Sequence, residues 1–211
     1  MTASVRRPAN FSAFDDATRA LVRLAAVVTG GREDDVRASL AGVADTVPHP
    51  WVEELLLQTY LFAGFPRALN AMREWRRVQP NPVDTDADTR GATELRASGE
   101  ETCATVYGEM YERLRDNVRA LHPALDEWMI TEGYGKVLSR SALDLPRREL
   151  CIVAACAAAD QGRQLHSHLH GALNAGVAAH VLDATLESLA DVVTAEQLRS
   201  ARLLWARVRG K

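Results

Sequence analysis

The sequence predicts an all-α protein, and three observations support this. Leucine, alanine, arginine and glutamate dominate the composition, and these residues have high helix propensity. Apolar residues recur at helical spacing along most of the chain. Long alternating runs of β-branched residues, which are typical of strands, are missing. Because 47% of the 211 residues are hydrophobic, we expect a buried core and a single domain over 1–211.

The first half of the chain is expected to form four helices. Proline is tolerated in the first turn of a helix, and Pro50 and Pro66 therefore mark two helix starts. The expected helices cover 15–30, 33–45, 51–63 and the segment after Gly64. The composition then changes over 79–101, which is rich in Pro, Asp, Thr and Gly and has almost no large apolar side chain. This stretch is predicted to be a linker.

The second half is also expected to be helical. A loop is predicted for "EGYGKVLSRSALDLP", and Asp144 at its end is a suitable N-cap for a helix that runs to 159. Gly176 suits the left-handed position that ends the next helix. The other helices are expected over 102–117, 123–132, 164–176, 178–190 and 194–208.

The two halves resemble each other, which predicts an internal duplication. Residues 19–77 align with 148–206 without a gap, pairing Gly42 with Gly171 and several leucines and alanines with their counterparts. The order of the expected helices also matches. In this alignment Glu149 faces Ala20 and His168 faces Ser39. Any site that uses these two side chains therefore belongs to the second copy, and the first copy, 19–77, is degenerate.

Three of the six histidines alternate in "QLHSHLHGALNAG". In a helix His166 and His170 lie one turn apart on the same side, whereas His168 points away from both, at the edge of the apolar stripe. An i,i+4 histidine pair can bind zinc or nickel, but no third ligand is evident. Two polar residues on a solvent-exposed helix face are therefore the favoured interpretation. His168 fits either a histidine bonded to a backbone carbonyl or a catalytic group.

Glu149 begins "ELCIVAACAAA", a helix that is apolar on every side and must be buried. A carboxylate in such a helix is costly unless it is paired or protonated, and such groups are suited to acid–base catalysis. The alternative is a first-turn carboxylate stabilised by the helix dipole and by Arg147 or Arg148. Together with His168 on the next, antiparallel helix, Glu149 makes a candidate proton-transfer pair.

Charge and targeting signals exclude some classes of partner. The net charge is −3 and no basic block occurs, so nucleic acid is not expected as a partner. The N-terminus lacks a signal peptide, no run has the ~18 apolar residues of a membrane helix, and no membrane partner is expected. Cys103, Cys151 and Cys156 lack a disulfide framework and fit core positions. These features predict a cytoplasmic protein.

The segments "YGKVLSRSALDLPRREL" and "QLHSHLHGALNAG", separated by an alanine-rich helix, resemble the carboxymuconolactone decarboxylase family, which includes the alkylhydroperoxidase D type of peroxidase. The resemblance is strongest over 134–206 and weaker over the first copy. It implies an all-α fold of helical hairpins that assembles as a trimer or hexamer. The glutamate of the family's R-E-L motif falls on Glu149, and its histidine falls on His168.

The resemblance also implies a branch of the family. The peroxidases carry a Cys-x-x-Cys motif, and Gln161 and Gln164 stand at those positions here, so the redox couple is missing. We therefore expect a lyase or isomerase, without cofactor or metal, that acts on a small carboxylated lactone or related ring. Glu149 and His168 would be catalytic, and Arg163, His166 and Arg148 would bind substrate. The alternatives are a peroxidase-like redox protein that uses Cys151 or Cys156, and a scaffold without catalysis.

Overall fold

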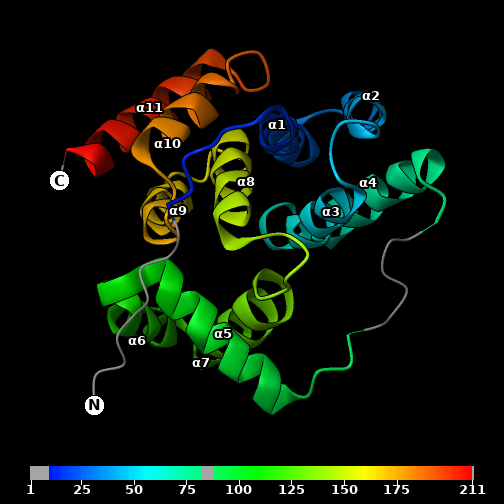
Figure 1. Ribbon diagram of the computed structural model, residues 1–211. Coiled ribbons are helices and arrows are strands. Elements are labelled where there is room, and N and C mark those ends of the chain that lie inside the picture. Colours follow the sequence, from blue (N-terminus) through cyan, green and yellow to red (C-terminus); the bar gives the residue numbers. More distant parts are fainter. Residues whose placement is uncertain (1–9, 82–87, 211) are drawn as a thin grey trace.

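The computed structural model describes residues 10–81 and 88–210, and within these ranges the protein is all-α, as predicted (Figure 1). No strand forms within these two ranges, where the β-type pairing is an isolated bridge between Phe11 and Val177. None of the helices in this part of the chain is long and apolar enough to span a bilayer.

The first four helices follow the local signals in the sequence. The Asp15 side chain accepts a hydrogen bond from the backbone N–H of Thr18 at 2.7 Å and so caps the first helix. Pro50 and Pro66 lie in the first turns of the third and fourth helices, as predicted. The bounds are α1 (Asp16–Gly30), α2 (Glu33–Val43), α3 (His49–Ala63) and α4 (Phe65–Val78).

The last four helices obey the same rules. Asp144 caps α8 by accepting a hydrogen bond from the backbone N–H of Arg147 at 2.9 Å. Gly176, just after α9, has a φ of +94°, the left-handed conformation that the sequence predicted for a glycine at this point. The bounds are α8 (Leu145–Ala158), α9 (Gly162–Asn174), α10 (Ala179–Glu187) and α11 (Ala195–Arg209).

The helix bounds of the two halves repeat. In the alignment of 19–77 with 148–206, the first residues of α1–α4 fall on positions 145, 162, 178 and 194. The helices α8–α11 begin at Leu145, Gly162, Ala179 and Ala195. The equivalent helices α1 and α8 pack against each other at the centre of the molecule (Figure 1). This agreement supports the proposal of a duplicated helical unit.

The middle of the chain differs from the prediction. Helix α5 (Ala92–Tyr107) begins inside the predicted linker, and the expected helix over 102–117 is interrupted by a 3₁₀ turn, η1 (Gly108–Met110). Gly108 has a φ of +52°, which ends α5 before α6 (Tyr111–Leu121) begins. The predicted loop is also mostly helical, because α7 (Pro123–Trp128) continues into a π-helix, η2 (Met129–Leu138).

Two glycines explain how α5 and η2 pack. A Cβ atom at Gly99 would lie 2.1 Å from the carbonyl oxygen of Ile130, and one at Gly135 would lie 2.0 Å from that of Leu95. Both distances are far below van der Waals contact, so the two backbones touch directly. Helix α5 therefore needs few large apolar side chains, and this explains why the sequence of its first part, up to residue 101, predicts a linker.

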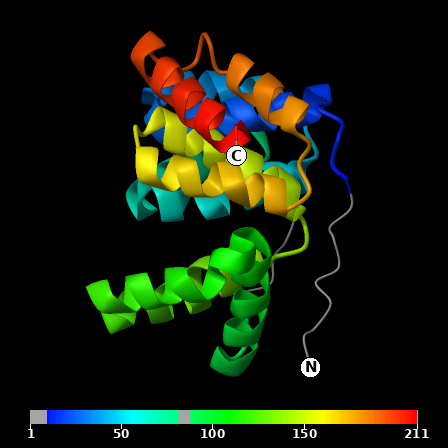
Figure 2. The same cartoon turned by 90° about the vertical axis from the view of Figure 1, so that its left-hand side faces the viewer.

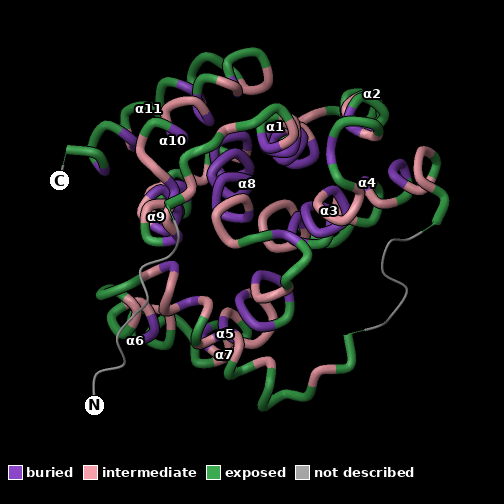
Figure 3. The backbone as a smooth tube through the Cα atoms, in the orientation of Figure 1, coloured by how far each residue is buried: buried purple, intermediate pink, exposed green. Residues whose placement is uncertain are grey.

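The helices form two groups, which are separate in Figure 2: α5–α7 with η2 lie on one side of the larger group of α1–α4 and α8–α11. Helix α8 is the centre of the larger group, and every residue from Arg148 to Ala158 is buried (Figure 3). Alanine is frequent in α8, and its small side chain allows α1 and α9 to approach closely.

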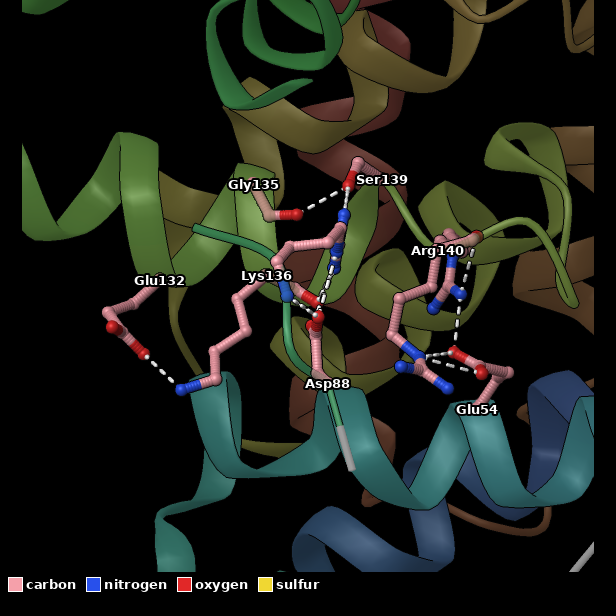
Figure 4. A network of polar contacts seen from close by, with 9 residues as sticks. Glu54, Asp88, Glu132, Gly135, Lys136, Ser139 and Arg140 are labelled. Carbon is pink, nitrogen blue, oxygen red and sulfur yellow. Dashed lines mark hydrogen bonds and ion pairs between the residues drawn. The ribbon is translucent and has the colours of Figure 1, made fainter. Parts of the chain in front are cut away.

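Polar contacts connect the two groups of helices (Figure 4). The Arg140 guanidinium, just after η2, donates to the Glu54 carboxylate of α3 at 2.8 Å. Arg90, just before α5, forms an ion pair with Asp88 at 2.7 Å and donates to Ser139 Oγ at 2.9 Å. Because Glu54 is buried, its contact with Arg140 defines how the end of η2 lies against α3 better than an exposed pair would. The Arg90 contacts hold the segment before α5 against the end of η2.

The direct backbone contact predicts different outcomes for two glycines of η2. Gly135→Ala is expected to lower the free energy of unfolding by about 1–3 kcal/mol or more, because the new methyl group overlaps a backbone carbonyl. Gly133→Ala is the matched control, since nothing lies within 4 Å of its Cβ position, and its effect should stay within about 1 kcal/mol. Urea unfolding monitored by circular dichroism measures both. Equal effects of the two substitutions would disprove the close contact.

Candidate active site

Two oppositely charged side chains stand next to each other on α8, and both are fully buried: Arg148 and Glu149. The Arg148 guanidinium donates to Glu54 Oε2 at 2.7 Å and to Gln58 Oε1 at 3.1 Å, both on α3. It also donates to the backbone carbonyls of Leu143 and Arg140. The geometry gives no support to the predicted substrate-binding role of Arg148, because it makes four hydrogen bonds inside the core and does not line the cavity at His168.

Glu149 points to the other side of α8, toward α9. Its Oε2 atom lies 2.9 Å from Nδ1 of His168, which is 6% exposed. The sequence predicted this pair, and the structure brings the two side chains together. The second carboxylate oxygen, Oε1, is buried and receives no hydrogen bond from the described residues. Glu149 therefore fixes the orientation of the imidazole through one oxygen, and Nε2 is the ring nitrogen left to meet a bound molecule.

Gly171 makes this arrangement possible. A Cβ atom at this position would lie 2.6 Å from Glu149 Oε2 and 2.7 Å from a methyl carbon of Val106. The absence of a side chain on α9 thus leaves room for the carboxylate between α8, α9 and α5. In the first half the equivalent residue is Gly42, which has nothing within 4 Å of its Cβ position. The first half has Ala20 in place of Glu149, so no carboxylate needs the space there.

His168 lines a cavity of about 900 Å³ between the two groups of helices. The walls come from the end of α3, from α5–α7, from η2 and from the first turns of α9. Most of the lining is apolar or aromatic, and the Phe62 ring meets the His168 ring edge-on with centroids 5.7 Å apart. An apolar cavity with few polar groups is typical of a small-molecule site.

Two tyrosines that the sequence reasoning missed lie in the wall of this cavity. Tyr107 ends α5 and Tyr134 lies in η2, with ring centroids 6.3 Å apart. Burial raises the pKa of Tyr107 to about 12 and that of Tyr134 well above its ordinary value, so both hydroxyls stay protonated at neutral pH. Tyr134 belongs to the segment for which the sequence predicts a loop, and no motif around it indicates a site.

The remaining predicted site residues fall in different places. Arg163, in the first turn of α9, is exposed and lines the cavity, so it is placed to meet an anionic substrate. His166 does not line the cavity. Its ring stacks edge-on against that of His170 with centroids 5.0 Å apart, as their spacing predicted, and the substrate-binding role predicted for His166 is not supported.

The two glutamines at the peroxidase cysteine positions also have structural roles. Gln161 donates from Nε2 to the backbone carbonyl of Phe62 at 3.3 Å, which joins the start of α9 to the end of α3. Gln164 lines the cavity. Cys103, Cys151 and Cys156 are free thiols in the core, and burial raises each pKa from the usual 9.0 to about 12. A neutral thiol is a poor nucleophile, which argues against redox chemistry.

The part of the chain that matches a known family contains the Glu149–His168 pair. Residues 123–207, which include Glu149 and His168, match the model of the carboxymuconolactone decarboxylase family. The predicted resemblance is therefore confirmed, and the match begins before residue 134, where the resemblance over the second copy was placed. It takes in α7 and the whole of η2, which form one wall of the cavity.

Two curated proteins are similar to this chain over part of their length. "Peroxisomal protein 2" of Schizosaccharomyces pombe is 31% identical over 137 residues, which cover 61% of this chain and 62% of the relative. "Peroxisomal protein 2" of Saccharomyces cerevisiae is 24% identical over 151 residues, which cover 58% of this chain and 53% of the relative. The chain thus spans little more than half the length of these relatives. Both are named as peroxisomal, which contradicts the prediction of a cytoplasmic protein.

The contact at Gly171 gives a prediction with a control inside the same chain. Gly171→Ala is expected to lower the free energy of unfolding by about 1–3 kcal/mol, because the methyl group displaces Glu149 or Val106. The equivalent substitution in the first half, Gly42→Ala, should raise it by about 0.5–1 kcal/mol through helix propensity. Chemical denaturation compares the two. A Gly171→Ala protein as stable as Gly42→Ala would show that the carboxylate does not need this space.

The buried thiols give a prediction of reactivity and of pH dependence. None of the three cysteines should react with a thiol reagent in the native protein at pH 8, and all three should react after unfolding. Their folded pKa values, about 12, lie above the unfolded value of 9.0. The neutral buried thiols therefore make their full contribution to the free energy of unfolding below pH 9, and this contribution is lost as the pH rises toward 12. Rapid native labelling of Cys151 or Cys156 would reopen the redox alternative.

Proposed function

We propose that this protein is a cofactor-free lyase or isomerase that acts on a small carboxylated lactone or related ring by proton transfer. The observation that carries the proposal is the buried hydrogen bond between Glu149 and His168 at the wall of a largely apolar cavity. A histidine held in this way by a carboxylate is suited to general acid–base catalysis near neutral pH. The cavity favours an enzyme over a scaffold without catalysis.

The charges around the cavity suggest how a substrate would lie. The apolar walls accommodate a ring, and Arg163 at the exposed start of α9 can pair with a carboxylate. Glu132 in η2 also lines the cavity, but its charge is balanced by Lys136 at 3.3 Å. A second, reacting carboxylate would then lie deeper, near His168, where the low polarity of the site favours loss of its charge as CO2.

The proposed reaction is a decarboxylation in two steps. The bond between the ring carbon and the carboxylate breaks, CO2 leaves, and the electron pair moves into a conjugated carbonyl to give an enolate. His168 then delivers a proton from Nε2 to carbon, the carbonyl re-forms, and the histidine regains a proton from water. Glu149 orients the ring and stabilises the imidazolium through Nδ1. An isomerisation would use the same proton transfer without loss of CO2.

Substitution of the pair tests the proposal. His168→Ala is expected to lower kcat on the best of a panel of carboxylated lactones by about 10²–10⁴-fold, because the proton donor is lost. Glu149→Gln should lower it less, since the amide still hydrogen-bonds the ring but carries no charge. Release of CO2 and the loss of lactone absorbance measure turnover.

The neighbouring histidines are the controls. His166→Ala and His170→Ala should retain wild-type turnover, because neither residue lines the cavity. Full activity of His168→Ala, or no turnover of any carboxylated lactone by the wild-type protein, would contradict the proposed function.

A further inference from the structure

Three hydroxyl groups from three different elements meet in one wall of the cavity. Tyr107 comes from the end of α5, Tyr134 from η2 and Ser167 from α9, directly before His168. The two tyrosine rings pack edge-on with centroids 6.3 Å apart. Side-chain hydrogen bonding with Tyr134 and Ser167 lowers the pKa of Tyr107, but the larger effect of burial raises it.

The consequence is a polarised donor. A tyrosine hydroxyl in this wall carries a proton that it can donate to an oxygen atom of a bound molecule. Burial raises the pKa of Tyr107 to about 12, so its hydroxyl is protonated at neutral pH. Chains of hydrogen bonds strengthen the terminal donor, and in an apolar cavity such a donor stabilises negative charge more than it would in water.

The surrounding structure holds these groups in place. Gly135, next to Tyr134, touches the backbone of α5, and Asn174 of α9 donates to the backbone carbonyl of Val106, next to Tyr107, at 2.9 Å. The backbone segments that carry Tyr107 and Tyr134 are therefore held in place by α9 and by α5. A group of preorganised donors next to a proton-transfer pair is the arrangement that oxyanion stabilisation requires.

We propose that Tyr107, supported by Tyr134 and Ser167, is an oxyanion-binding site that takes the enolate oxygen of a conjugated carbonyl substrate. This inference rests on the proposed function and narrows its substrate class. His168 transfers the proton at carbon, and Tyr107 donates to the oxygen where the charge collects. The Glu149–His168 pair is neutral overall when the imidazole is protonated, so it does not repel that charge. A substrate without a carbonyl conjugated to the reacting carbon forms no enolate oxygen, so the Tyr107 hydroxyl would not stabilise its transition state.

Binding of 4-nitrophenol to the full-length protein tests the site without any assumption about the natural substrate. Its phenolate mimics an enolate oxygen on a ring, and the phenol and phenolate absorb at different wavelengths. The wild-type protein should bind the phenolate and lower the apparent pKa of the bound phenol. Tyr107→Phe should weaken phenolate binding about tenfold or more. Binding of 4-nitroanisole, which cannot ionise, should be the same in both proteins.

Two further variants control for folding and for a general effect of a lost hydroxyl. Tyr111→Phe removes a hydroxyl that bonds Arg115 on α6 outside the cavity lining, and it should leave phenolate binding unchanged. Ser167→Ala alters a partly exposed side chain, so it tests the cluster if Tyr107→Phe does not fold. It should weaken phenolate binding about threefold, because Tyr107 loses one supporting donor.

The outcomes separate this inference from the proposed function. Wild-type affinity of Tyr107→Phe and Ser167→Ala for the phenolate, or equal binding of 4-nitroanisole and 4-nitrophenolate by the wild-type protein, would overturn the oxyanion site. If decarboxylation is lost in His168→Ala but is unchanged in Tyr107→Phe, only the inference fails. If phenolate binding depends on Tyr107 while no carboxylated lactone is turned over, the oxyanion site stands and the proposed function fails.

Discussion

Arg148 and Glu149 are buried side by side on α8, and each needs an oppositely charged or polar partner inside the protein. Neither charge is exposed, and leaving either one without its partner would cost about 3–5 kcal/mol. Successive residues of a helix point about 100° apart, so the two side chains must find partners in different directions. Arg148 finds Glu54 on α3, and Glu149 finds His168 on α9. One pair joins the two halves of the chain in the core, while the other lies at the cavity.

The sequence predicted those elements whose signals are local. Asp144 caps α8, Pro50 and Pro66 begin α3 and α4, and Gly176 follows α9, each because of a backbone requirement that acts over a few residues. The segment 79–101 was predicted less well, because α5 is stabilised by contact of its backbone with η2 rather than by large apolar side chains. Only the three-dimensional packing shows that Gly99 has a partner at all.

The candidate site was predictable to a similar extent. Helical spacing places Glu149 in a buried helix and His168 at the edge of an apolar stripe, which makes both candidate site residues. The resemblance to a known family predicts the same pair. The role of Arg148 could not be predicted, because the sequence does not show that Glu54, far away in the chain, accepts its hydrogen bonds. Tyr107 and Tyr134 were missed for the same reason, since their proximity depends on the crossing of α5 over η2.

The contact between Gly99 on α5 and the backbone of η2 also has a mechanical consequence. Two helices whose backbones touch cannot slide or separate by rearranging side chains, so α5 and η2 must move as one rigid body. Tyr107 and Tyr134 move together with it, and Leu138 at the end of η2 lies within the same unit. A change in the spacing between the two groups of helices would therefore have to take place outside this body. The connection between η2 and α8, residues 139–144, lies outside this body.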